Sequence, residues 1–266
     1  MNAKKLSKNA LIGYPAGIIT GVAYGLNPLF GMPLIHGGAS IDSILFFRYI
    51  FAVALLGLFL LVTKQSFKVS AKQAGVLLTL GTLYTMSSIF LFESYNYIAS
   101  GLATTLIFLY PVLVAIIMVF LRVVPSWPVW LSIAATFGGV IINRSTVIRS
   151  ISNSLLTFYA LLTGGVIFLC KIFFADTGIT TGIEGATAWS YLIGLALLPT
   201  IVSTATLAVA TRNIGATKAS VLGVFEPITA IMVGTLIFGE PLTANIIIGI
   251  VISIVAVTFM IATTKR

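Results

Sequence analysis

The sequence predicts an all-α protein that crosses a membrane several times. Of its 266 residues, 59% are hydrophobic and only 8% are charged, whereas soluble domains carry about 25% charged residues. The apolar runs approach or exceed the roughly 20 residues that a spanning helix needs, and none shows the period-two alternation of a membrane β-strand. Nine candidate spans follow one another at about 11–35, 43–63, 74–93, 101–121, 127–142, 154–174, 187–210, 217–238 and 243–262.

The positive charges indicate a membrane topology rather than a nucleic-acid-binding surface. The net charge of +9 gathers in short clusters between apolar runs, including the lysines at 4–8 and at 64–72. Cytoplasmic loops of membrane proteins carry such clusters, so the amino terminus is predicted to be cytoplasmic and no nucleic-acid partner is expected. The run at 11–35 is too long for the apolar core of a signal peptide and is interpreted as the first span.

The charge pattern reverses after the fifth run. Counting nine helices places the basic loop at 143–149, together with Arg212 and Lys218, on the outer side, against the positive-inside rule. One additional helix near residue 143 would return these residues to the cytoplasm. The sequence therefore indicates a ten-helix arrangement from which one helix is missing.

A weak internal repeat identifies the missing helix. Shifting the chain by 116 residues superimposes 75–125 on 191–241 and aligns two pairs of prolines, while the first span has no counterpart in the second half. In the ten-helix register the two halves have opposite orientations, as in many transporters. We therefore predict two inverted repeats, residues 1–142 with five helices and residues 143–266 with four, the second repeat lacking its first helix.

Several short motifs carry a resemblance to a known family. They are YGLNPLF at 24–30 and FFRY at 46–49 in the first repeat, and RNIGATKAS at 212–220, Glu226-Pro227 and Gly239-Glu240 in the second. In these features the chain resembles bacterial members of the EamA family of the drug/metabolite transporter superfamily. The resemblance implies ten helices in two inverted repeats and a multi-pass protein of the cell (inner) membrane. It also implies a small-molecule substrate, a metabolite or a drug, which is exported by alternating access.

Two polar interruptions of the apolar spans are candidate substrate or coupling sites. Glu226 lies well inside its span, where a carboxylate is costly and usually faces a cavity or a partner, and Pro227 beside it is expected to kink the helix. Asn27 and Pro28 interrupt the first span, and such breaks expose backbone carbonyls to a ligand. The alternatives are a structural carboxyl bonded to neighbouring groups and a packing kink.

Three further side chains are candidates for a central site: Arg48, Tyr84 and Tyr110. The tyrosines would supply polar-tipped aromatic walls, or alternatively would anchor spans at the membrane interface. Arg48 could pair with Glu93, or could extend its side chain to the lipid headgroups. Headgroup contact is also the interpretation of Lys171.

Small residues and a second carboxylate mark expected structural contacts. Gly13, Gly17 and Gly21 recur every four residues in the first span and predict a close helix contact. Glu240 follows the span at 217–238 and is expected in an outer loop or at a helix cap, with gating as the alternative.

A membrane enzyme is disfavoured, because its chemistry generally needs clustered acids, histidines or metal ligands. The six acidic residues are scattered and His36 is the single histidine, and the phosphate-binding motif GxxxxGK[ST] is absent. We therefore predict a secondary transporter with no catalytic residues, no metal and no cofactor, whose partners are a small-molecule substrate and the lipid bilayer. The alternative is an inactive or impaired deletion remnant. Both a monomer and a homodimer are compatible with the sequence.

Overall fold

The computed structural model describes residues 3–104, 151–175, 178–215 and 222–241, together with positions 219, 247, 251 and 255, and their side chains from Asn9 onward. Every regular element within these residues is helical, which confirms the all-α prediction. The elements are α1 (Ala3–Gly25), α2 (Asn27–His36), α3 (Ile41–Val62), α4 (Ala71–Ser94), α7 (Asn153–Phe174), α8 (Gly185–Leu195), the π-helix η1 (Ala196–Val202), α9 (Ser203–Ile214) and α11 (Phe225–Phe238).

Five of the described helical stretches are long and apolar enough to cross a bilayer. They are Asn9–His36, which joins α1 and α2, then α3, α4, α7, and Gly185–Ile214, which joins α8, η1 and α9. These stretches coincide with five of the predicted spans. Most of the predicted spans at 101–121, 127–142 and 243–262, and the expected junction near residue 143, lie outside the described residues. The helix count and the boundary between repeats therefore stay predictions.

Helix boundaries follow from capping residues that flank the apolar runs. The hydroxyl of Ser40 accepts a hydrogen bond from the Ser43 N–H at 3.1 Å at the start of α3. Ser70 forms a reciprocal capping box with Gln73 at the start of α4, and Ser152 caps α7. Such caps satisfy backbone N–H groups that have no partner within the helix.

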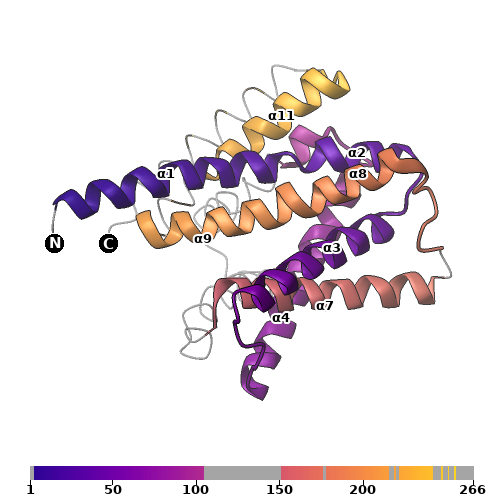
Figure 1. Ribbon diagram of the computed structural model, residues 1–266. Coiled ribbons are helices and arrows are strands. Elements are labelled where there is room, and N and C mark those ends of the chain that lie inside the picture. The colour runs from indigo at the N-terminus through magenta and orange to yellow at the C-terminus, as the bar shows by residue number, and fades with distance from the viewer. Residues whose placement is uncertain are drawn as a thin grey trace, which may run out of the picture.

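The amino-terminal helix packs against helices from the second half of the chain. In Figure 1, α1 runs alongside α9, with α11 on its other side, while α3 and α4 both lie against α7. The two halves of the sequence are therefore interleaved in one bundle.

Glycines allow this close packing of α1. A Cβ atom added at Gly21 would lie 2.9 Å from the carbonyl oxygen of Leu222, and one at Gly25 would lie 2.5 Å from that of Glu226. The close helix contact expected from the four-residue glycine spacing is confirmed, and it extends one turn further, to Gly25. The backbones of α1 and α11 touch where larger residues would separate them.

Candidate functional site

The first helix break lies where the sequence predicted it. Helix α1 ends at Gly25 and α2 begins at Asn27, with Pro28 in its first turn. Pro28 has no N–H to donate to the carbonyl of Tyr24, its partner in a continuous helix. The side-chain amide of Asn27 donates to that carbonyl instead, at 2.8 Å. Asn27 is 2% exposed, so this bond forms inside the bundle.

A second break precedes Pro227. The chain turns at Gly223 and Val224, and α11 begins at Phe225. Pro227 therefore lies in the first turn of α11, where a backbone N–H has no helical acceptor. Where the sequence predicted a kink beside Pro227, the structure has a helix interruption three to four residues before this proline. Because Gly21 and Gly25 of α1 lie against this segment, the two broken regions are neighbours.

Arg48 is buried in the protein, and both structural interpretations of it from the sequence are wrong. The residue is 0% exposed, so its side chain does not reach the headgroups. Its Nε donates to the hydroxyl oxygen of Thr200 at 2.8 Å, and its guanidinium carbon lies 5.6 Å from the centre of the Phe92 ring. Glu93 is exposed and contacts Asn96 instead.

A π-helix positions the acceptor of this bond. Pro199 removes an N–H within the span Gly185–Ile214, and the chain takes seven residues of π-helix there, a conformation frequent at functional sites. The Thr200 hydroxyl donates to the Leu195 carbonyl at 2.9 Å while it accepts from Arg48. Sequence reasoning did not identify Thr200. The available signal was Pro199 inside an apolar run.

Several buried polar atoms of the bundle have no hydrogen-bond partner among the described residues. They include both terminal nitrogens of Arg48, the Asn27 side-chain oxygen and the Tyr84 hydroxyl. The Tyr84 ring stacks on Tyr49 with centroids 5.8 Å apart, while the Tyr49 hydroxyl pairs with Ser88 at 2.7 Å. An unpaired buried polar group costs about 1–3 kcal/mol. The arrangement therefore suits a polar ligand that would supply the missing partners.

Glu226, at the start of α11, is the second charged candidate residue. Tyr24 on α1 is within electrostatic range of both Arg48 and Glu226. The Glu226 carboxylate is half-buried, and within the described part of the chain no hydrogen bond or ion pair involves it. The alternative interpretation from the sequence, a structural carboxyl bonded to neighbouring groups, therefore finds no bonding partner for Glu226 among the described residues.

Comparison with known proteins supplies the family. The EamA-like transporter family matches the chain twice, over residues 11–145 and 144–262, and together these matches cover nearly the whole sequence. The chain belongs to the EamA-like transporter family. It is therefore a multi-pass membrane transporter whose partners are a small-molecule substrate and the lipid bilayer. No curated protein matches it.

The double match to the EamA family does not favour the deletion-remnant alternative, because both halves carry recognisable family sequence. Among the candidate residues, the structure places Asn27, Pro28, Arg48 and Tyr84 in one bundle with Glu226 and Pro227; Tyr110 lies outside the described residues.

Two other charged side chains of this EamA protein make structural contacts. Glu240 accepts hydrogen bonds from the backbone N–H and the hydroxyl of Ser100, at 2.9 and 2.8 Å. It therefore caps the helical residues at 100–104, in agreement with the expected cap role. Lys171 pairs with Asp42 at 2.6 Å, so the headgroup interpretation of Lys171 is replaced by an ion pair between α7 and α3.

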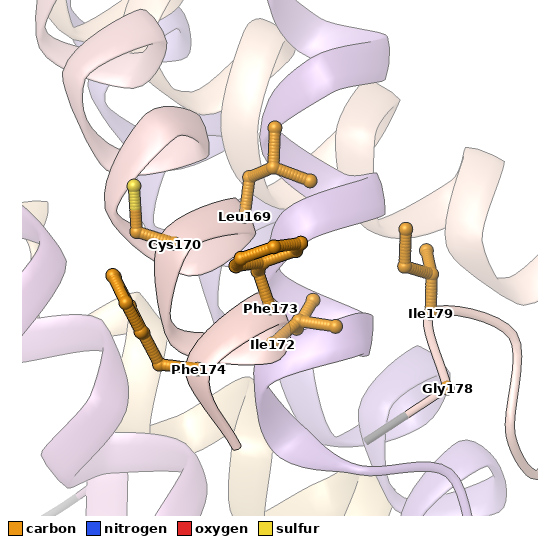
Figure 2. Close-up of a pocket in the computed structure, with 7 residues that line it drawn as sticks. All are labelled: Leu169, Cys170, Ile172, Phe173, Phe174, Gly178 and Ile179. Carbon is orange, nitrogen blue, oxygen red and sulfur yellow. The ribbon is translucent and has the colours of Figure 1, made fainter. Parts of the chain in front are cut away.

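Two hollows lie away from the Arg48 region. One, of about 350 Å³, lies between α2 and the start of α8, next to Glu184 and Tyr191. The other, of about 700 Å³, is at the end of α7 and is shown in Figure 2; it is lined by Leu169, Cys170, Ile172, Phe173, Phe174, Gly178 and Ile179. Phe173 and Phe174 are 80% and 84% exposed, as expected for a lipid-facing surface. Neither hollow contains a candidate residue of the site.

Proposed function

We propose that this EamA protein is a secondary transporter that exports a small metabolite or drug by alternating access, with its substrate bound between the two helix breaks. The observation that carries the proposal is that buried polar atoms of Arg48, Asn27 and Tyr84 have no hydrogen-bond partner among the described residues. In lipid an unsatisfied polar group is costly, and such groups are retained in a membrane bundle where they contact a ligand.

The placement of the breaks supports a transport site. Transporters with inverted repeats commonly bind substrate near the bilayer midplane, at interrupted helices where the two halves meet. Here the break after Gly25 comes from the first half, and the break before Phe225 comes from the second. Relative movement of the halves would change the surroundings of both breaks together, which is the requirement for alternating access.

Glu226 is the proposed coupling residue. Its carboxylate is half-buried at the second break and unpaired within the described part of the chain, so it is available to bind a proton or a polar group of the substrate. Tyr24 on α1 lies within electrostatic range of both Glu226 and Arg48. We infer transport rather than catalysis for this chain.

The proposed topology follows from the basic loops. The amino terminus and the loop at 64–72 would lie in the cytoplasm, with the protein in the cell (inner) membrane, because positive loops are retained on that side. The proposed repeats are 1–142 and 143–266, the second without its first helix.

A metabolite-export screen tests the function. Cells that express the chain are compared with cells that carry an empty vector, and intracellular and secreted small molecules are measured by mass spectrometry. We expect at least one compound to be secreted faster with the chain present and Glu226→Gln to abolish most of the difference. Glu93→Gln is the matched control, since Glu93 is exposed on α4. Equal secretion by vector and wild-type cells, or full activity of Glu226→Gln, would contradict the proposal.

A further inference from the structure

We infer that the substrate carries a carboxylate, which binds the two terminal nitrogens of Arg48. This inference rests on the proposed function and names the substrate class for that site. It is argued from the burial of Arg48, from the partner of its Nε and from the kinds of polar group around it.

The burial of Arg48 leaves a positive charge without an anion among the described residues. An arginine guanidinium stays protonated in proteins, and Arg48 is completely buried. The single ion pair among the described residues joins Lys171 to Asp42, so no described carboxylate neutralises Arg48. The Phe92 ring, 5.6 Å away, gives a cation–π contact, which compensates for only part of the lost hydration. A bound anion would supply the rest.

The geometry at Nε leaves the other end of the guanidinium free for a ligand. Thr200 accepts from Nε at 2.8 Å, while within the described part of the chain both terminal nitrogens lack partners. Two parallel N–H groups of a guanidinium match the two oxygens of a carboxylate in a bidentate pair. Thr200 thus fixes the orientation of Arg48 without using the pair of donors that a carboxylate needs.

The neighbouring groups favour an acceptor-rich ligand over a cation. The Tyr84 hydroxyl is buried and has no partner in the described ranges, and Tyr24 and Tyr49 lie within electrostatic range of Arg48. Phenolic hydroxyls can donate to a carboxylate, whereas a cationic ligand beside Arg48 would face like-charge repulsion in a medium of low dielectric constant. Pairing the substrate carboxylate with Arg48 would also neutralise the negative charge that the substrate carries across the membrane.

The first test compares exported compounds across matched variants in the mass-spectrometry screen. Arg48→Gln removes the charge at the site, and Arg212→Gln makes the same change at an exposed position on α9. We expect every compound secreted through the wild-type chain to bear a carboxylate, Arg212→Gln to resemble the wild type, and Arg48→Gln to lose at least about tenfold in secretion rate, as for a lost charge-assisted hydrogen bond. Secreted compounds without a carboxylate, or unchanged secretion by Arg48→Gln, would overturn the inference.

The second test uses only the wild-type protein, so it is valid even if Arg48→Gln does not fold. The purified chain is reconstituted in liposomes, and uptake of the labelled compound identified in the screen is measured. The competitors are the same compound without label and its carboxamide. We expect the carboxylate to compete at least about tenfold better than the carboxamide. Equal competition would refute the carboxylate contact.

Two outcomes separate the possible failures. Replacing chloride with methanesulfonate, which has no carboxylate, should leave uptake unchanged at constant substrate; if uptake falls with chloride removal and the carboxamide is still transported, an inorganic anion occupies Arg48 and the inference is wrong. If no compound is secreted through the wild-type chain, the proposed function fails and this inference with it. Secretion of an uncharged compound refutes the inference alone.

Discussion

Substituting Gly25 with alanine should separate α1 from α11 at the second helix break. The added Cβ would lie 2.5 Å from the carbonyl oxygen of Glu226 and 2.7 Å from the Cβ of Thr229. Because ordinary contacts begin near 3.4 Å, the backbones must move apart by about 1 Å, and such overpacking typically costs about 1–3 kcal/mol. The movement would displace Glu226 together with its helix.

Gly75→Ala is the matched control. Gly75 lies within α4, and a Cβ added there meets no atom within 4 Å. Alanine in a helix interior is favoured over glycine by roughly 0.5–1 kcal/mol, so this variant should be as stable as the parent or slightly more stable. The two variants carry the same chemical change and differ in whether the new methyl group meets a neighbouring helix.

The assay is thermal unfolding of the purified protein in detergent, followed by export at matched membrane abundance. One kcal/mol shifts the Tm of a chain of this size by roughly 2–4 °C, so Gly25→Ala should melt several degrees below Gly75→Ala and export more slowly. If Gly25→Ala melted with the control and exported normally, the described contact between α1 and α11 would be wrong.

Two further predictions concern charge. Glu240→Gln should lower stability by about 0.5–2 kcal/mol through its weakened helix cap, yet reduce export less than Glu226→Gln does; the reverse order of export activities would argue against Glu226 as the coupling residue. Cysteines introduced at positions 68 and 218 in a Cys170→Ala background should both resist a membrane-impermeant reagent added to intact cells, whereas labelling at 218 but not at 68 would show that the second half is inserted in the opposite orientation.

Local sequence features predicted local structure well. The apolar runs located five described spans because a bilayer imposes a minimum length on each helix. The break at Asn27-Pro28 followed from the missing proline N–H, and the glycine contact of α1 followed from a four-residue spacing that places small residues on one helix face. Each of these properties depends on residues that are close together in the chain.

Long-range partners could not be predicted in the same way. Arg48 and Thr200 are separated by 152 positions and Ser100 and Glu240 by 140. A single sequence does not show which residues so far apart in the chain are in contact. The interpretation of Arg48 as a headgroup contact failed because hydropathy gives the depth of a residue but not the side of the helix that faces the protein. The internal repeat likewise relates whole helices and leaves their side-chain contacts undetermined.

The packing of α1 has a consequence for biosynthesis. Its glycine face lies against Ile214 on α9 and against Glu226 on α11. About 200 further residues must therefore be synthesised after Gly13 before its partner exists, which takes roughly 10–40 s at ~5–20 residues per second. During this interval the first helix emerges from the ribosome long before its binding surface exists. Membrane insertion of α1 and its final docking are therefore separate events, and a nascent chain stalled before residue 214 would hold α1 without its partner helix.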